Sequence, residues 1–213
     1  KQIVIVPMLR DKPEDADVLA YCETLAKELN AQTAFQAPVR AHVDKGQARS
    51  ADKRWDWVRR GAPLLLEIGP RDAANGQVTF MRRDKLRDGD KIKSHAMARG
   101  EFVKEAVDLL GDIQNDLLNE AKARLNANIR TDISSYNDLA DYFGTDEDGG
   151  GFKGWVKAGW CKASGKQLDE IGNKLKALKL TFRNAPLDQG GELGACIFTG
   201  APAKEQILIA RAY

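Results

Sequence analysis

The sequence predicts an α/β protein in which a mixed β-sheet carries helices on its faces, followed by a small α+β domain. Two nearly continuous apolar runs, 3–6 and 63–68, are typical of strands that are covered on both faces. Residues 77–83 alternate between two sets of side chains, which is typical of a strand with two distinct faces. Stretches with helical spacing of apolar residues separate these runs and predict the order β-α-β-α-β-β over the first 83 residues.

The composition gives no general sign of a nucleic-acid-binding protein. Among 213 residues, 33 Lys and Arg stand against 31 Asp and Glu, so any RNA site must be a local basic patch. No apolar run is long enough to span a membrane, and the chain opens on a strand without a signal peptide. Three widely spaced cysteines fit a reducing, cytoplasmic setting. Because the chain begins at Lys1 without Met, we expect it to be a piece of a longer protein.

The first sixty residues predict two strands, each followed by a helix. The first helix is expected at about 14–29, with Pro and acidic residues in its first turn. A second strand is expected over 39–44. Ser50 is the predicted N-cap of a second helix over 51–60.

This second helix combines basic residues with aromatic ones. The mixture suits single-stranded RNA, because bases stack on flat side chains while cations meet phosphates. The residues concerned are Lys53, Arg54, Trp55, Trp57, Arg59 and Arg60. The alternative is one tryptophan in the core, with basic side chains that are merely solvated.

Residues 61–83 predict a strand, a tight turn at Gly69-Pro70 and a second strand, with Asn75-Gly76 as a further turn signal. Charged side chains stand at the ends of these buried strands: Glu67, Arg71, Asp72 and Arg82. Loops at strand ends are where an α/β sheet usually places binding residues. The alternative is an ordinary hairpin with a salt-bridged turn.

Four segments of the sequence resemble a known family. They are I-V-I-V-P at 3–7, V-R-A-H-V-D-K at 39–45, W-x-x-x-G-x-P-L-x-L-E-I-G-P-R-D at 57–72, and V-x-x-x-R-R-D at 78–84. Together they resemble the anticodon-binding domain of prolyl-tRNA synthetases, in the archaeal or eukaryote-like form that carries an extra C-terminal domain. The hexapeptide E-I-G-P-R-D separates this resemblance from other class II anticodon domains.

The resemblance implies a class IIa anticodon-binding fold and a parent enzyme, a proline–tRNA ligase, that uses ATP and Mg²⁺ to attach proline to tRNA. It also implies that the parent is cytoplasmic and homodimeric. This part would bind the anticodon loop of tRNA(Pro) and adjoin the catalytic domain of the same polypeptide. The sequence contains no class II catalytic motif, phosphate-binding glycine loop, metal cluster or Ser-His-Asp arrangement, so we expect no catalytic residue and no cofactor in this segment.

The implied ligand suits carboxylates and guanidinium groups. Proline anticodons share two adjacent guanines, whose unstacked edges offer N1–H and N2–H donors and O6 and N7 acceptors. Glu67 or Asp72 would accept from the first edge. Arg71 or Arg82 would donate to the second. Lys53, Arg54 and Arg83 would contact phosphates. Trp55 would stack on the face of a base.

The resemblance weakens along the chain. We predict an anticodon-binding domain at 1–100, connecting helices at 101–150 and a zinc-binding-like C-terminal domain at 151–213. The connection would hold helices at 101–129 and 135–143 before an acidic and glycine-rich break at 146–151. The C-terminal domain is expected to contain a helix at 166–178 and strands near 154–161, 180–184, 195–199 and 206–211.

Zinc-bearing relatives gather four cysteines in this domain, whereas only Cys161 and Cys196 occupy such positions here. Two thiolates cannot complete a tetrahedral structural zinc site, so we predict that zinc has been lost and that ordinary packing holds the domain. The residues expected in that packing are Trp155, Trp160, Ile171, Leu175, Leu180, Phe182, Ile197 and Ile207. The final Tyr213 also resembles the family, and the resemblance implies that its carboxylate lies toward the catalytic domain.

Two alternatives stay open at this point. A free-standing anticodon-like module would bind RNA or regulate it without an attached ligase, and a gene encoding only this segment would favour it. A structural or protein-interaction α/β domain would not bind tRNA, so salt-dependent tRNA binding would exclude it.

Overall fold

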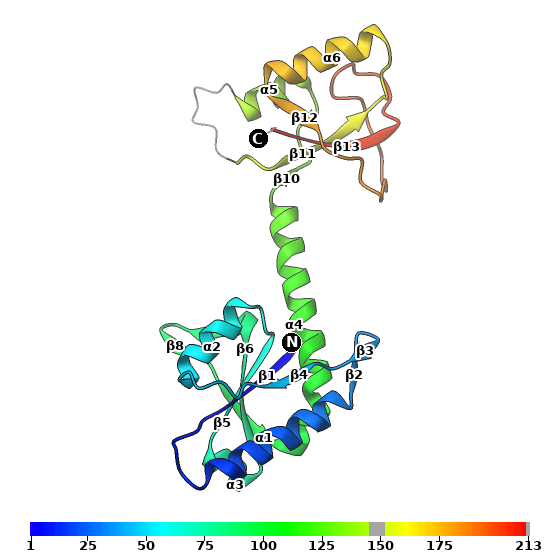
Figure 1. The fold of residues 1–213 in the computed structure, drawn as a ribbon. Coiled ribbons are helices and arrows are strands. Elements are labelled where there is room, and N and C mark those ends of the chain that lie inside the picture. Colours follow the sequence, from blue (N-terminus) through cyan, green and yellow to red (C-terminus); the bar gives the residue numbers. More distant parts are fainter. Residues whose placement is uncertain (145–151, 212–213) are drawn as a thin grey trace. The chain divides into compact units, whose positions relative to one another are not determined.

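The computed structural model describes residues 1–144 and 152–211 (Figure 1). The chain divides into two compact units, Lys1–Glu120 and Ala121–Tyr213, and the division falls within the long connecting helix. The predicted break at 146–151 and the final Tyr213 lie outside the described residues. Within the described ranges, no helix is both long enough and apolar enough to cross a membrane.

Unit 1 is built on the mixed sheet that the sequence predicts. Its strands lie in the order β4-β1-β5-β6-β9. Their bounds are β1 Ile3–Pro7, β4 Ala41–Val43, β5 Leu64–Ile68, β6 Gln77–Arg82 and β9 His95–Ala98. The strands β4, β1 and β5 are parallel, whereas β6 runs antiparallel to both β5 and β9. The two apolar runs therefore form the paired central strands β1 and β5, which are buried on both faces.

Helices cover the two faces of this sheet (Figure 1). On one face, α1 (Asp15–Asn30) and the first part of α4 (Arg99–Ala127) pack against alternate residues such as Ile5 and Leu66. On the other face, α2 (Ser50–Arg59) packs against the intervening residues, which include Leu65 and Met81. The alternation of side chains along each strand thus decides which helix each residue meets.

The link between β5 and β6 corrects the sequence prediction of a tight turn. It is a short helix, α3 (Pro70–Asn75), that begins after Gly69 and is closed by Gly76 in the left-handed conformation, with φ 61°. Proline suits the first position of a helix because its missing N–H has no intrahelical partner there. The Asp72 carboxylate also accepts from the Gly69 N–H at 2.9 Å, which caps the first turn. These two signals favour a helical turn over a hairpin.

Smaller elements of unit 1 were absent from the sequence prediction or placed differently. Ser50 lies inside α2 rather than capping it, and the N-cap Arg49 provides no side-chain hydrogen bond. Two short hairpins and one turn of 3₁₀ helix complete the unit. Their bounds are β2 Thr33–Ala34, β3 Ala37–Pro38, η1 Arg83–Lys85, β7 Arg87–Asp88 and β8 Lys91–Ile92.

Unit 2 has its own sheet, in the order β10-β11-β13-β12, and its own apolar core. The elements after α4 are β10 Ile129–Arg130, α5 Tyr136–Phe143, β11 Trp155–Trp160, α6 Lys166–Ala177, β12 Leu180–Phe182 and β13 Glu205–Arg211. Ser135 caps α5 by accepting from the Asp138 N–H at 3.1 Å. Here the predicted cap is correct.

Two predictions for unit 2 are wrong. Residues 195–199 form a turn with isolated bridges to Gly159 and Pro202 instead of a strand, because the chain folds back sharply at Gly200, with φ 70°. Trp155 is only partly buried and lies edge-on to Phe152, with ring centroids 5.1 Å apart, instead of entering the core. The other predicted packing residues lie in that core or pack against it.

Gly159 provides a test of how tightly this turn packs on β11. A Cβ atom there would lie 2.4 Å from the Ala195 carbonyl oxygen and 2.8 Å from that of Leu193, both backbone atoms. We therefore expect Gly159→Ala to lower the free energy of unfolding of unit 2 by about 1–3 kcal/mol, as over-packed sites do. Urea denaturation followed by circular dichroism measures this loss.

Gly172→Ala is the matched control, because Gly172 lies within α6 and a Cβ atom there meets nothing within 4 Å. It should raise stability by about 0.5–1 kcal/mol through helix propensity. Equal stability of the Gly159→Ala variant and the unmodified chain would show that the turn does not press on the strand.

Candidate nucleic-acid interface

The carboxylate of the E-I-G-P-R-D hexapeptide is held by α2. Glu67 lies on β5 opposite Thr79, on the same sheet face as Leu65 and Met81, and this face is the one that α2 covers. There its Oε1 accepts from Arg54 Nη1 at 2.8 Å. The side chains of Arg54 and Glu67 are 18% and 16% exposed, so water screens this pair much less than a surface ion pair. The pair fixes a carboxylate and a guanidinium group side by side at the edge of the helix.

Trp55 lies next to this pair and contacts two guanidinium groups. The central carbon of Arg54 is 5.9 Å from the centroid of the Trp55 ring, and that of Arg87 is 5.4 Å away. Arg87 stands on the β7–β8 hairpin, whose Ile92 packs in the same apolar cluster as Trp55. Cation–π contact of this kind concentrates positive charge around an aromatic ring. No pattern in the sequence connects Arg87 with Trp55, because the two stand on separate elements without a shared periodicity.

Two guanidinium N–H groups in this region have no partner. The Nε atoms of Arg54 and Arg83 are buried and form no hydrogen bond within the described residues. Arg83 is otherwise fixed through its backbone N–H, which donates to the Pro63 carbonyl at 2.9 Å. Buried donors of proteins are nearly always hydrogen-bonded to protein, water or a ligand, so each of these two N–H groups can take an acceptor from outside the chain. We call Arg54, Trp55, Glu67, Arg83 and Arg87 the α2 face.

Arg71 is the most accessible of the predicted base-reading residues. It lies in the first turn of α3 and is exposed. Its guanidinium group forms no hydrogen bond or ion pair with any described residue. All its donors are therefore available to a ligand.

Lys53, one of the residues predicted to meet phosphates, has its side chain buried against the end of β4. Its side chain is 6% exposed, and Nζ donates to the Asp44 carbonyl at 3.0 Å and lies 3.7 Å from Asp44 Oδ1. Asp44 also accepts from Trp57 Nε1 at 2.7 Å. Burial would raise the pKa of Asp44, but the hydrogen bond from Trp57, that from the Gly46 N–H and the charge of Lys53 together lower it below its ordinary value. These contacts fasten α2 to the end of β4.

Asp72 is likewise committed inside the protein. Its two carboxylate oxygens accept from the Gly69 N–H and from the Thr79 hydroxyl, each at 2.9 Å. It caps α3 and ties that helix to β6, instead of presenting a free carboxylate to a base.

Arg82 lies on the opposite face of the sheet from Glu67. Its guanidinium group donates to Asp84 at 3.1 and 2.7 Å and to Asp116 of α4 at 2.8 Å, and the side chain is 13% exposed. The hydrogen bond with Asp84 raises the pKa of Arg82, although burial opposes this shift. The negative charge of Asp84 and the hydrogen bond with Asp116 raise this pKa further. Arg82 therefore joins β6 to α4. The predicted alternation places it correctly on the face of Val78 and Phe80, but the sequence did not reveal Asp116 as its partner.

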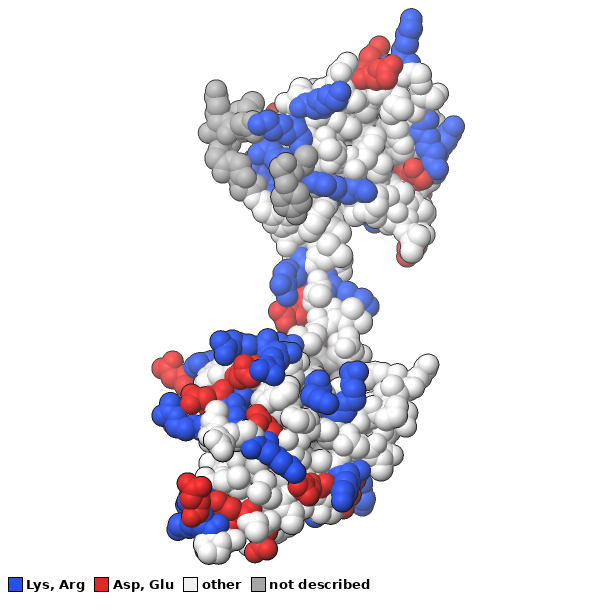
Figure 2. Space-filling model, viewed as in Figure 1, with Lys and Arg blue, Asp and Glu red and all other residues white. Residues whose placement is uncertain are grey.

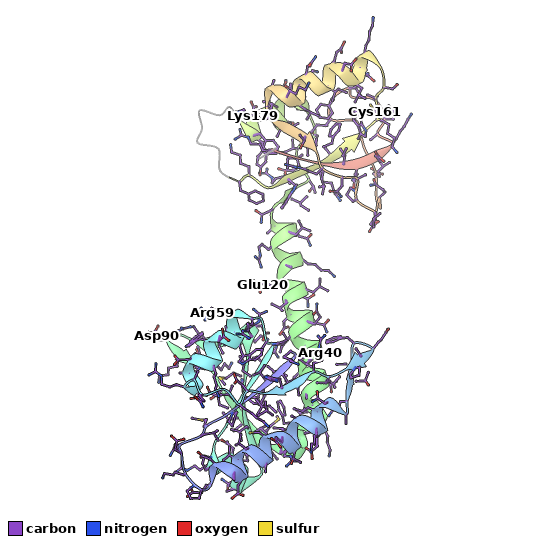
Figure 3. The ribbon with its side chains drawn as sticks, viewed as in Figure 1. Arg40, Arg59, Asp90, Glu120, Cys161 and Lys179 are labelled. Carbon is purple, nitrogen blue, oxygen red and sulfur yellow. The ribbon has the colours of Figure 1, made fainter. Side chains whose placement is uncertain are left out.

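A basic surface surrounds the α2 face. In Figure 2, Lys and Arg side chains gather over the part of unit 1 where α2 and β8 lie, with acidic side chains between them. The exposed basic residues on these elements and their flanks are Arg49, Arg59, Arg60, Arg87, Lys91 and Lys93. Figure 3 marks Arg59 on α2 and Asp90 on the neighbouring hairpin. The local patch that a nearly neutral chain needs for RNA is therefore present.

The two cysteines of unit 2 lie together. Cys196 forms a bridge with Gly159, two residues before Cys161, and the Thr199 hydroxyl lies 3.6 Å from Cys161 Sγ. Burial would raise the pKa of Cys196, but hydrogen bonds from Thr199, Phe198 and Cys161 outweigh it and lower this pKa.

These donors do not fit zinc. Among the described residues, no three His, Cys, Asp or Glu side chains are placed to hold a metal ion. Two sulfurs and a threonine hydroxyl fall short of the four nitrogen or sulfur ligands of a structural zinc site. That the domain takes no zinc stays a prediction.

The chain is similar to a known protein family and to individual known proteins. The family described as "Anticodon binding domain" matches residues 2–109. Proline–tRNA ligases of Sphingomonas elodea and Sphingopyxis alaskensis are each 48% identical over the whole chain, which covers 41% and 39% of their lengths. The chain thus spans about two fifths of these relatives.

Solved structures show a similar fold. Prolyl-tRNA synthetases of Cryptosporidium parvum and Giardia lamblia align over the entire chain with TM-scores of 0.71 and 0.76, at 23% and 21% identity. The chain covers 41% and 42% of those two proteins.

Asp44 offers a test of the contacts that hold α2. Asp44→Asn removes the negative charge beside buried Lys53 and should lower the free energy of unfolding at pH 7 by about 1–3 kcal/mol. Because the pKa of Asp44 is lowered on folding, its contribution is complete above the unfolded value of about 4 and disappears as the pH falls through the folded pKa. The difference between variant and unmodified chain should therefore shrink below about pH 4 in urea titrations.

Asp52→Asn is the control, since Asp52 pairs with Arg49 on the exposed side of the same helix. It should change stability by less than about 0.5 kcal/mol at either pH. A difference for Asp44→Asn that stays constant down to pH 2 would contradict the assignment.

Proposed function

The chain belongs to the anticodon-binding domain family, and we propose that it is the anticodon-reading part of a proline–tRNA ligase. The parent enzyme would attach proline to tRNA with ATP and Mg²⁺. Its catalytic residues would lie in the portion of the relatives that this chain does not span. This part would hold the anticodon loop while the catalytic part acts on the other end of the tRNA.

The observation that carries the proposal is the α2 face, where the Glu67 carboxylate, the Arg54 guanidinium group with its open Nε–H and the Trp55 indole lie together. An unstacked guanine offers two adjacent N–H donors to a carboxylate. Glu67 uses Oε1 for Arg54, so its Oε2 is the acceptor available to such an edge. Charge-assisted bonds of this type discriminate by about 1–3 kcal/mol per base, by analogy with DNA readout.

The other predicted residues divide into contacts and supports. Arg71 would donate to guanine O6 and N7, because its guanidinium group is exposed and uncommitted. Arg54 and Arg83 would give their open Nε–H groups to phosphate or base oxygens. Lys53, Asp72 and Arg82 would act only by holding α2, α3 and β6 in place.

The parent enzyme would combine a sequence similar to bacterial relatives with a domain layout similar to eukaryotic enzymes. The relatives given above at 48% identity are bacterial, whereas the two solved structures given above, which align with the whole chain, are of eukaryotic enzymes. We infer a bacterial enzyme with the archaeal or eukaryote-like layout, in which a C-terminal domain follows the anticodon-binding domain. A cytoplasmic homodimer that binds tRNA(Pro) fits this assignment.

Base recognition is tested with anticodon stem-loops. The chain should bind a proline anticodon stem-loop about tenfold more tightly than a copy in which both guanines are replaced, as one lost base contact of about 1–3 kcal/mol implies. Arg71→Ala should remove most of this preference, because the fork of donors to guanine is lost. Fluorescence anisotropy at two salt concentrations measures both affinities.

Arg49→Ala is the matched control, since Arg49 is an exposed arginine at the start of α2 with only a surface ion pair. It should keep the preference for guanine. Equal binding of both stem-loops by the unmodified chain would contradict base readout, and a normal preference in Arg71→Ala would move readout to other residues.

Arg87 should behave differently from Arg71. If it supplies charge beside Trp55, Arg87→Ala should weaken binding of both stem-loops by a similar factor. The slope of log affinity against log salt should also fall by about 0.7, the value for one phosphate contact on a single strand. A loss confined to the guanine-bearing loop, with an unchanged salt slope, would instead identify Arg87 as a base reader.

A further inference from the structure

Unit 2 places two thiols at the end of β11, far along the chain from each other. Cys161 directly follows β11, and Figure 3 marks it there. Cys196 forms a parallel bridge with Gly159, and the next residue, Ile197, donates its N–H to the Gly159 carbonyl at 3.1 Å. Cys161 therefore lies two residues beyond Gly159, the point where the turn that carries Cys196 is attached to β11.

This turn is closed by its own backbone. The Cys196 carbonyl accepts from the Gly200 N–H at 2.9 Å, and the Cys196 N–H donates to the Ala201 carbonyl at 2.8 Å. Gly200 can close the turn because its φ of 70° lies in the left-handed region, which glycine enters without steric cost. The position of Cys196 is thus fixed by backbone hydrogen bonds, not by the thiols themselves.

The two thiols lie in the same corner of unit 2, and their surroundings differ. Cys196 is 2% exposed and belongs to the apolar core, against which Cys161 packs. Cys161 is partly exposed, and its sulfur accepts from the hydroxyl of Thr199, which lies in the turn that carries Cys196. One thiol is therefore accessible to small solutes, and the other is its sheltered neighbour.

We propose that Cys161 and Cys196 form a reversible dithiol–disulfide pair, with Cys161 as the sulfur that meets the oxidant and Cys196 as the sulfur that closes the bond. Two neighbouring thiols without further ligands suit a covalent bond better than a tetrahedral metal. The inference rests on unit 2 alone and does not depend on RNA binding.

Hydrogen peroxide is the oxidant in this scheme. The Cys161 thiolate attacks one peroxide oxygen, the O–O bond breaks, and a sulfenic acid forms as hydroxide leaves. The Cys196 thiolate then attacks the Cys161 sulfur, the S–O bond breaks, and the departing hydroxide takes up a proton. In total two thiols lose two protons and two electrons, and one peroxide becomes two waters.

The bond would fasten the turn at 195–200 to the end of β11. Trp160, which precedes Cys161, and Phe198, two residues after Cys196, already meet edge-on in the core of unit 2, with centroids 6.1 Å apart. A cross-link between residues distant in the chain restricts the unfolded state and therefore raises stability. The oxidised chain should unfold at a higher temperature than the reduced one.

Mass spectrometry of the 213-residue chain tests the proposal, and Cys22 serves as an internal control. Cys22 is fully buried in unit 1, and burial raises its pKa to about 12, so it should not react. Brief treatment with hydrogen peroxide should lower the intact mass by about 2 Da, the two hydrogens lost on forming one disulfide. Peptide mapping should join Cys161 to Cys196, and dithiothreitol should reverse the change.

Thermal unfolding and single variants sharpen the test. Oxidation should raise the unfolding midpoint of unit 2 by about 5–10 °C. In Cys196→Ser the mass should not fall, and dimedone should trap a sulfenic acid at Cys161. In Cys161→Ser the sheltered Cys196 should stay unlabelled while the fold is intact by circular dichroism.

Several outcomes would overturn the proposal. They are a gain of oxygen mass without disulfide formation, a cross-link that contains Cys22, disulfides only between molecules, and no reaction at excess peroxide. Dimedone labelling of Cys196 in Cys161→Ser as fast as that of Cys161 in Cys196→Ser would overturn the order of attack. The measurements on the unmodified chain decide the question even where a variant fails to fold.

Discussion

A carboxylate within a strand that is covered by a helix needs a cation, and the pairing of Glu67 with Arg54 meets this requirement. The alternation of β5 turns Glu67 toward α2, so the partner has to come from that helix. The position of Arg54 then sets that of Trp55, the next residue. The arrangement of functional groups on the α2 face thus follows from one charge that the sheet cannot leave unpaired.

Much of the remaining charge in unit 1 holds elements together. Lys53 joins α2 to β4, Asp72 joins α3 to β6, and Arg82 joins β6 to α4. A group whose donors or acceptors are all used inside the protein cannot also read a base without giving up those bonds. The Arg71 guanidinium group has no such partner among the described residues, and for this reason we propose Arg71, not these three residues, as a base contact.

The apolar runs and the spacing of apolar residues made the large helices and strands predictable from the sequence. The apolar runs became β1 and β5, and helical spacing placed α4 within two residues of its observed ends. Partners distant in the chain were not predictable: Asp116 for Arg82, Arg87 for Trp55 and Asp44 for Lys53 carry no local signal. The helix α3 was missed because Gly69-Pro70 serves equally well as a turn or as a helix start.

Among the residues that the structure describes, unit 1 and unit 2 bury separate sets of apolar residues. Substitutions at distant sites without shared partners add nearly independently in free energy. The two halves of the chain can therefore accumulate changes at different rates. Substitutions can accumulate in the core around Cys161 and Cys196 while the residues packed beneath the α2 face stay the same. Sequence divergence in unit 2 therefore does not have to match sequence divergence in unit 1.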